Sequence, residues 1–124
     1  MANILVVDDE DNVRFVIKET LEQDLHSVSE ACTGSEALEM FETKPAELVI
    51  TDLVMPDKNG IDLILELKNR YPNVQILAIS GGGGLNGKFD YIPIAELIGA
   101  KSVMRKPFNL VDLRNTVNEL LEAV

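Results

Sequence analysis

The sequence is poor in cysteine and in aromatic residues. Cys32 is the single cysteine, tryptophan is absent, and aromatic residues make up 5% of the 124 positions. One cysteine excludes an internal disulfide and is typical of a protein from a reducing compartment. Because Cys32 follows an apolar stretch, we expect it to be a small buried residue rather than a nucleophile.

Positive charge is also scarce. Lys and Arg number 11 against 21 Asp and Glu, so the formal net charge is −10. A nucleic-acid-binding protein usually presents a basic stripe that neutralises phosphates, and an anionic membrane surface would repel this chain. We therefore expect neither partner. The acidity fits a cation or a basic protein partner, but it would serve solubility equally well.

Long hydrophobic runs are missing. No apolar run approaches the roughly 18 residues that a membrane helix needs. The N-terminus lacks the basic segment and long apolar core of a signal peptide. We therefore expect a cytoplasmic protein in which residues 1–124 form a single domain without an output domain.

Short apolar runs are spread evenly along the chain instead. They predict strands at residues 4–7, 26–31, 48–50, 76–79 and, more weakly, 102–104. Between them, apolar residues recur at helical spacing. Strands that alternate with helices form a parallel sheet covered on both faces, so the pattern predicts an α/β, doubly wound fold.

Four helices are marked by apolar positions and a fifth by the less regular stretch 91–98. The marking positions are Val13, Val16, Ile17 and Leu21; Ala37, Leu38 and Phe41; Ile61, Ile64, Leu65 and Leu67; and Leu110, Leu113, Val117, Leu120 and Leu121. Thr33 with Glu36 predicts a capping box, and Asn109 predicts an N-cap.

Unusual polar residues stand where these strands end. Asp8, Asp9 and Glu10 follow the first strand, and the other strand ends carry Asp52, Ser80 and Lys106-Pro107. The carboxyl ends of parallel strands meet at one edge of the sheet, where ligands of open α/β sheets bind. The sequence therefore brings carboxylates, a hydroxyl and an ammonium group to one edge.

Converging carboxylates repel one another, and a divalent cation with a preference for hard oxygen ligands, such as Mg²⁺, relieves this repulsion. A lysine and a serine hydroxyl can bind the oxygens of an incoming phosphoryl group. Taken singly, an Asp at a strand end is a turn or cap residue and Lys106 a solvated side chain. Taken together, the set indicates a phosphoryl-transfer centre with a carboxylate nucleophile.

These residues resemble the receiver domain of bacterial response regulators, of the single-domain type, from about residue 3 to residue 121. The resemblance is carried by Val6-Val7-Asp8-Asp9-Glu10, Asp52-Leu53-Val54-Met55-Pro56 with Gly60, Ser80-Gly81, and Lys106-Pro107-Phe108. It implies a flavodoxin-like (βα)5 fold with strand order 2-1-3-4-5. It also implies a regulatory phosphoacceptor that assists its own phosphorylation and dephosphorylation, rather than an enzyme.

The resemblance further implies roles for individual residues. Asp52 would accept the phosphoryl group, and Ser80, followed by Gly81, would be the switch hydroxyl. Lys106 would pair with the phosphoryl oxygens and form a cis peptide with Pro107. The metal, Mg²⁺ or Mn²⁺, would be bound by Asp9, Asp52 and the Val54 backbone carbonyl, and by Asp8 mostly through water.

The resemblance implies partners as well. A histidine kinase or a histidine phosphotransfer protein would donate the phosphoryl group. A downstream protein target would dock on the face made by the fourth helix, fifth strand and fifth helix. His26 matches no phosphodonor motif, and we interpret it as structural.

Two departures from the family pattern stand out. Val103 occupies the position, three before the lysine, where the family usually has an aromatic switch residue. Residues 81–87 contain five glycines, which predicts a mobile loop that phosphoryl binding could order. Gly60 follows Asn59 and is predicted to serve a backbone with positive φ.

Other functions remain open from the residues alone. A phosphatase with an aspartyl intermediate would want a second Asp at position 54, which is Val54 here. Gly82, Gly87 and Lys88 fit part of a nucleotide-binding loop, but Phe89 replaces the required Ser or Thr. A purely structural pseudo-receiver would not need the acidic set together with Ser80 and Lys106.

Overall fold

The computed structural model describes residues 1–55, 59–81 and 90–122. Helices and strands alternate along this part of the chain, as the apolar pattern predicts. In order they are β1 (Asn3–Val7), α1 (Asp11–Gln23), β2 (Ser27–Ala31), α2 (Gly34–Thr43), β3 (Leu48–Asp52), α3 (Gly60–Arg70), β4 (Gln75–Ser80), α4 (Ile92–Ile98), β5 (Ser102–Arg105) and α5 (Leu110–Glu122).

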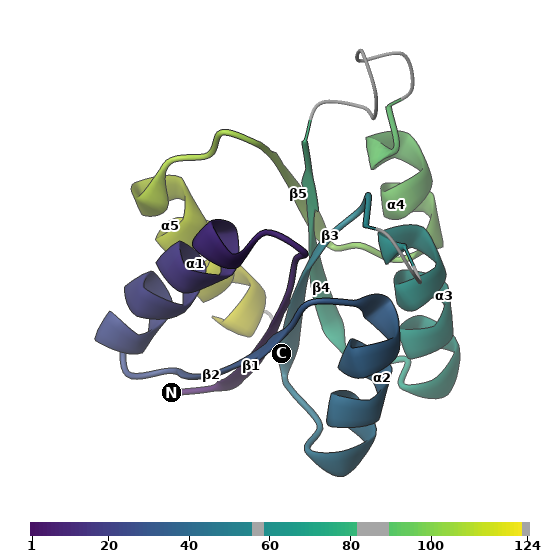
Figure 1. Cartoon of the computed structure of the whole chain (residues 1–124), viewed down its shortest axis with the longest axis horizontal. Coiled ribbons are helices and arrows are strands. Elements are labelled where there is room, and N and C mark those ends of the chain that lie inside the picture. Colours follow the sequence, from purple (N-terminus) through teal and green to yellow (C-terminus); the bar gives the residue numbers. More distant parts are fainter. Residues whose placement is uncertain (56–58, 82–89, 123–124) are drawn as a thin grey trace.

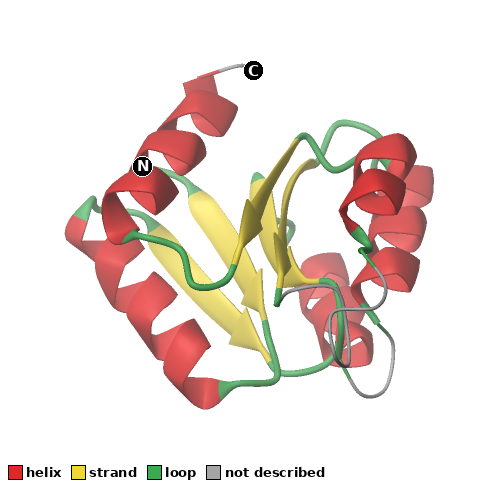
Figure 2. Ribbon diagram, turned by 90° about the horizontal axis from the view of Figure 1, so that it is seen from above, coloured by secondary structure: helices red, strands yellow, loops and turns green. Residues whose placement is uncertain are grey.

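The strands form one parallel sheet in the order β2-β1-β3-β4-β5. Helices α1 and α5 cover one face of it, and α2, α3 and α4 cover the other (Figures 1 and 2). This arrangement confirms the flavodoxin-like (βα)5 fold and its strand order. No helix among the described residues is long and apolar enough to cross a membrane.

Alternation along the strands divides the core into two layers. Leu5, Val7 and Val49 belong to the layer beneath α2, α3 and α4, whereas Ile4 and Val6 belong to the layer beneath α1 and α5. Successive side chains of a strand point to opposite faces, so a strand covered on both sides must be apolar at every position. Strand β3, buried throughout, satisfies this requirement and carries its last residue, Asp52, into the interior.

Polar side chains cap the starts of α2 and α5. Asn109 accepts a hydrogen bond from the Asp112 N–H at 2.9 Å, which confirms the predicted N-cap. Thr33 Oγ1 accepts one from the Glu36 N–H at 3.1 Å, but Glu36 Oε1 accepts from the Cys32 N–H at 2.7 Å rather than from Thr33. Half of the predicted capping box is therefore formed, with its reciprocal bond moved by one residue.

One burial prediction was wrong, and three of the apolar positions that mark the helices are exposed. Cys32 is exposed, because it stands past the end of β2 in the turn before α2. Val16, Leu65 and Leu110 are 41%, 47% and 42% exposed. Each lies at the margin of its helix's apolar stripe, and the stripe that meets the sheet is narrower than apolar spacing alone suggests.

The role predicted for Gly60 is also corrected. Its φ is not positive; Gly99 is the glycine with positive φ among the described residues. A Cβ on Gly60 would instead lie 2.1 Å from the Asp52 carbonyl oxygen and 2.6 Å from the Leu53 Cα. Glycine is needed because α3 begins against the backbone at the end of β3. The predicted mobile glycine loop and Pro56 lie mainly or wholly outside the described residues.

Candidate functional site

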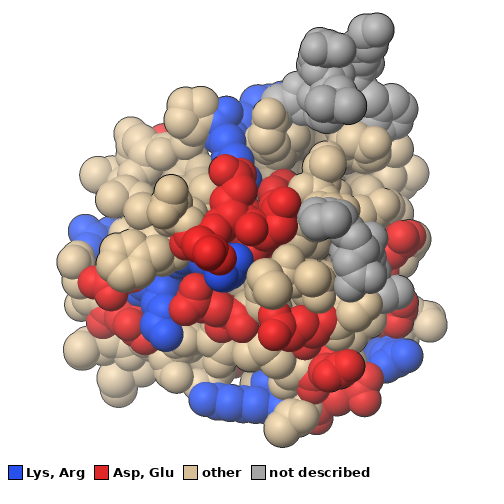
Figure 3. Space-filling model, in the orientation of Figure 1, with Lys and Arg blue, Asp and Glu red and all other residues tan. Residues whose placement is uncertain are grey.

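The polar residues singled out by the sequence converge at the carboxyl edge of the sheet. Asp8 follows β1, Asp52 ends β3, Ser80 ends β4, and Lys106 follows β5. Because these strands are adjacent and parallel, their ends bring residues far apart in the sequence into contact. Figure 3 shows acidic side chains gathered in the middle of one face, with basic side chains among them.

The Lys106 ammonium group is shared among three carboxylates. Its Nζ lies 2.8 Å from Glu10 Oε1, 3.0 Å from Asp8 Oδ2 and 3.2 Å from Asp52 Oδ2. Burial lowers the pKa of Lys106, but its hydrogen bond to Glu10 and its interactions with Asp8 and Asp52 outweigh this effect and raise that pKa above its ordinary value. Lys106 is therefore a fixed positive charge at the centre of the site.

Asp8 is held firmly in place. Its carboxylate is 1% exposed, and Oδ1 accepts a hydrogen bond from the Glu10 N–H at 2.8 Å. Its own N–H donates to the Ala31 carbonyl at 3.1 Å, which anchors it to the end of β2. Burial raises the pKa of the Asp8 carboxyl, and the bond from Glu10 and the charge of Lys106 offset only part of this rise.

Asp52 is also buried, with 5% of the residue exposed. The Val54 N–H donates to Oδ1 at 3.3 Å, while Lys106 contacts Oδ2. Burial raises the pKa of the Asp52 carboxyl and the neighbouring charge of Asp8 raises it further, against the opposing effect of Lys106. The site thus holds two buried carboxylates close together, an arrangement that favours an added cation.

Ser80 contributes a buried hydroxyl. The residue is fully buried, and its Oγ has no hydrogen-bond partner among the residues that the structure describes. The Lys106 N–H donates to the Ser80 carbonyl at 2.7 Å, so the two candidate site residues are tied through their backbones. A buried hydroxyl without a partner is costly and indicates a site completed by a ligand.

Three neighbouring positions were implied by the resemblance to belong to a switch. The Lys106–Pro107 peptide is cis, as the resemblance implied. Gly81 stands beside Lys106, where an added Cβ would lie 4.0 Å from the Lys106 Cδ, an ordinary contact. Val103 is half-buried and packs against the core layer beneath α2, α3 and α4.

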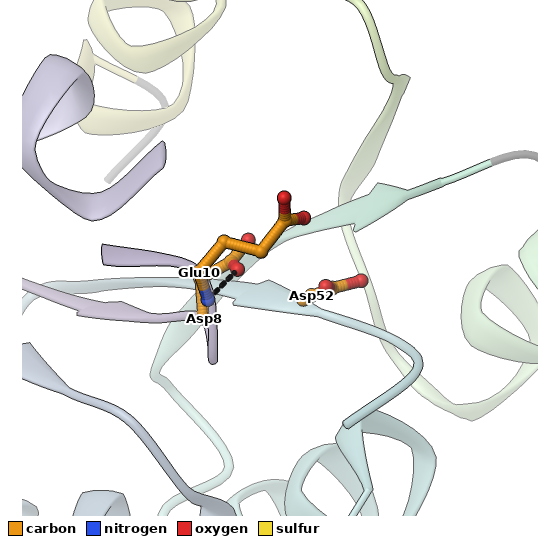
Figure 4. A group of neighbouring side chains, drawn as sticks. All are labelled: Asp8, Glu10 and Asp52. Atoms are coloured by element: carbon orange, nitrogen blue, oxygen red, sulfur yellow. Dashed lines mark hydrogen bonds between the residues drawn. The ribbon is translucent and has the colours of Figure 1, made fainter. Parts of the chain in front are cut away.

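A cation could be held by Asp8, Glu10 and Asp52. One carboxylate oxygen of each lies within 4.8 Å of the others, and the three side chains lie side by side at the strand ends (Figure 4). Oxygen donors of this kind suit Mg²⁺ or Mn²⁺. These oxygen donors fit the metal that the sequence predicts. Glu10 belongs to the group, however, and the predicted ligands Asp9 and Val54 do not.

Asp9 and Val54 are the two predicted metal ligands outside this group. Asp9 is exposed. Val54 is 44% exposed, and its N–H donates a hydrogen bond to Asp52 Oδ1. Their roles as ligands stay predictions. Glu10, by contrast, was recognised in the sequence only as part of the acidic run, and no role was assigned to it. Its signal was its position two residues after Asp8, where the turn into α1 reverses the chain.

A hollow of about 510 Å³ opens beside the carboxylates, between α1 and α5. It is lined by Glu10, Asn12, Val13, Val16, Lys106, Pro107, Phe108 and Leu110. Phe15 and Val111, on the same two helices, are 62% and 63% exposed. Because Val13, Val16, Phe108 and Leu110 are among the residues that line the hollow, an apolar surface borders the charged site.

Known proteins share both the sequence pattern and the fold. Residues 4–118 match the model of the response regulator receiver domain. The sensor kinase CckA of Brucella abortus is 34% identical over 98% of this chain, which spans 13% of CckA. The chain spans less than half the length of this and two further curated relatives.

Solved structures agree. The receiver domain of NtrX from Brucella abortus has a TM-score of 0.87 and 28% identity, covering 98% of this chain and 99% of that one. TrrA of Thermotoga maritima, solved in complex with Mg²⁺-BeF, has a TM-score of 0.83 and 29% identity, covering 97% and 99%. The chain belongs to the response regulator receiver domain family, whose members work in two-component phosphorelay signalling.

Proposed function

We propose that Asp52 accepts a phosphoryl group from a phosphohistidine of a histidine kinase or a histidine phosphotransfer protein, and that this step switches protein–protein interactions. The observation that carries the proposal is the placement of Lys106 Nζ about 3 Å from the Asp52 and Asp8 carboxylates. The Lys106 N–H also donates to the carbonyl of Ser80, whose buried hydroxyl has no partner within the described part of the chain. A nucleophile, a fixed cation and a hydroxyl donor are thereby brought to the same edge of the sheet.

The transfer itself is a displacement at phosphorus. A carboxylate oxygen of Asp52 attacks, an O–P bond forms, and the N–P bond breaks with its electron pair returning to the partner's imidazole nitrogen. Lys106 stabilises negative charge on the phosphoryl oxygens. Ser80 Oγ donates a hydrogen bond to one of them, which would satisfy a hydroxyl that has no partner among residues 1–55, 59–81 and 90–122.

Asp8, Glu10 and Asp52 would hold Mg²⁺ or Mn²⁺, with Asp9 and the Val54 carbonyl as the further predicted ligands. The bound ion supplies charge neutralisation at the carboxylates and the phosphoryl oxygens. The Mg²⁺-BeF complex of the similar protein TrrA supports this assignment. So does the burial of Asp8 and Asp52, which is the largest cause of the raised pKa of each carboxyl and which a bound cation would offset.

The chain would act as a regulatory phosphoacceptor in the cytoplasm rather than as an enzyme with a separate substrate. The hollow between α1 and α5 borders Lys106 and suits the partner that brings the phosphohistidine. The downstream target would dock on α4, β5 and α5. With a net charge of −10, nucleic acid is not expected among the partners.

Intact-mass measurement after incubation with Mg²⁺ and a small-molecule phosphodonor tests the proposal. We expect one added phosphoryl group on the wild type, and none on Asp52→Asn or after chelation of the metal. Addition to Asp52→Asn would show a different acceptor. No addition to the wild type under any condition would favour a purely structural pseudo-receiver.

A further inference from the structure

Arg14, in the first turn of α1, is a charged residue whose side chain is largely covered by the rest of the protein. Its side chain is 13% exposed, although the guanidinium group carries a permanent positive charge. Such a group is stable in the interior only when its donors are matched by acceptors. The acceptors that the guanidinium group contacts therefore show which parts of the chain Arg14 holds together.

The guanidinium group joins three parts of the chain. Nη1 donates to the Asp8 carbonyl oxygen at 2.6 Å, and Nε donates to Glu30 Oε1, on β2, at 3.2 Å. Nη2 donates to Asp11 at the start of α1. The planar fork presents its donors in several fixed directions and so reaches these three acceptors at once, whereas the ammonium group of a lysine is a compact charge on a flexible chain.

The contact with Asp8 completes a set of restraints on that residue. The Asp8 N–H is bound to the Ala31 carbonyl, its carbonyl to Arg14, and its Oδ1 to the Glu10 N–H. What remains is Oδ2, which faces Lys106 at 3.0 Å. Of these three hydrogen bonds, the one from Arg14 is made by a side chain, and the other two are made by backbone groups.

The charge of Arg14 is not itself directed at the site. Glu30 and Asp11 neutralise it, and neither of them belongs to the carboxylate group around Lys106. Arg14 therefore acts on the site through the position of the Asp8 backbone rather than by adding a second cation.

We propose that Arg14 is a positioning residue for the acidic site, which clamps the Asp8 backbone to β2 through Glu30 so that the Asp8 carboxylate meets Lys106 and a divalent cation in a fixed place. This inference rests on the proposed function for its metal. Outer-shell partners of this kind typically change metal affinity without touching the ion.

The test compares three variants by Mg²⁺ titration calorimetry and by amide hydrogen exchange of the metal-free protein. We expect Arg14→Met to weaken Mg²⁺ binding about tenfold and Arg14→Lys, which keeps the charge but not the fork, to fall between it and the wild type. Arg14→Met should also speed amide exchange at residues 8–11 relative to β3 and β4.

Lys18→Met is the matched control. Lys18 lies on the same helix and contacts the other Glu30 oxygen at 3.6 Å, but it makes no bond to Asp8. We expect its Mg²⁺ affinity to stay within about twofold of the wild type. If Arg14→Met does not fold, the double variant Arg14→Met/Glu30→Gln is used in its place. It also removes the negative charge of Glu30 that Arg14 would otherwise neutralise.

Unchanged exchange at residues 8–11 in Arg14→Met would overturn the inference, whatever the wild type binds. An equal loss of Mg²⁺ affinity in Lys18→Met would overturn it too, because the effect would then be general to α1. Failure of the wild type to bind Mg²⁺ would contradict the proposed function and the metal part of this inference, while the exchange data would still decide whether Arg14 holds the turn.

Discussion

Among single residues, Lys106 carries the largest share of the site's electrostatics. It is the cation that the structure places between the buried carboxylates of Asp8 and Asp52. Removing one partner of a buried ion pair costs more than the pair contributes, because the other charge is left without compensation. The metal-free protein should therefore depend on Lys106 for stability as well as for chemistry.

We predict that Lys106→Met lowers the free energy of unfolding by about 2–3 kcal/mol near neutral pH in the presence of a chelator. Lys106 lowers the pKa of both Asp8 and Asp52, so its removal raises these values further. A carboxyl whose folded pKa is raised destabilises the fold above that pKa, and the penalty fades as the pH falls through it. Urea denaturation at neutral and mildly acidic pH measures both effects.

Arg105→Met provides the control, since Arg105 is the neighbouring basic residue and its ion pair with Asp90 is largely exposed. Exposed pairs contribute little, so a change of less than about 1 kcal/mol is expected. If the two variants lose the same free energy of unfolding, leaving the buried carboxylates of Asp8 and Asp52 without Lys106 does not destabilise the protein more than breaking an exposed ion pair does.

At the level of elements, the close approach of α3 to the end of β3 positions Asp52. Gly60 makes this approach possible, and its N–H donates to the Leu53 carbonyl at 3.1 Å. We predict that Gly60→Ala destabilises the protein by about 3 kcal/mol, because a Cβ 2.1 Å from the Asp52 carbonyl oxygen forces the backbones apart.

Gly81→Ala is the matched control on the other side of the site, with an ordinary contact to Lys106. It should change stability by less than about 1 kcal/mol. Thermal unfolding of the two variants gives the comparison, and a Gly60→Ala protein as stable as Gly81→Ala would contradict the argument.

The pairing of β1 with β2 should respond to pH through His26. Its Nδ1 accepts a hydrogen bond from the Ala2 N–H at 3.1 Å, just before the two strands pair. Burial lowers the pKa of His26, and the charge of the N-terminus lowers it further. Protonation would remove the acceptor, so the folded form resists it.

A base whose folded pKa is depressed contributes stability that is complete above its unfolded pKa, about 6.5, and is lost as the pH falls through the folded value. The wild type should therefore lose stability as the pH falls below about 6.5, and His26→Gln should lose less over the same interval. Denaturation midpoints measured across this range provide the test. Parallel curves for the two proteins would exclude His26 as the cause.

For the whole molecule, the apolar surface between α1 and α5 should matter to a protein phosphodonor and not to a small one. Val16 and Leu110 line the hollow beside Lys106 and are partly exposed. We predict that Val16→Lys and Leu110→Lys slow transfer from a phosphohistidine protein about tenfold or more, because each buries a charge at the interface. Transfer from a small-molecule phosphodonor should stay near the wild-type rate.

Leu97→Lys serves as the control, because Leu97 is 85% exposed and lies on α4, on the opposite face of the sheet. The ratio of the rates from the two donors separates docking from chemistry. If Leu97→Lys slows transfer from the protein donor as much as Val16→Lys does, the phosphodonor does not dock between α1 and α5.

The sequence by itself determined the order of strands and helices and the edge at which the polar residues meet. Strands buried on both faces need apolar residues at every position, and the carboxyl ends of parallel strands share one edge. Asp8, Asp52, Ser80 and Lys106 could therefore be assigned to the site from the sequence. Their individual roles came from the resemblance to receiver domains.

Which side chains point inward at that edge could be seen only in the folded protein. Asp9 and Glu10 are adjacent and both acidic, yet only Glu10 contacts Lys106, 96 positions away in the sequence. The hydrogen bond from Arg14 to the Asp8 carbonyl and the close approach of Gly60 to the Asp52 carbonyl are likewise contacts that the sequence did not predict. Such contacts depend on how turns place the ends of several strands and helices relative to one another, and residue type and local periodicity do not specify this.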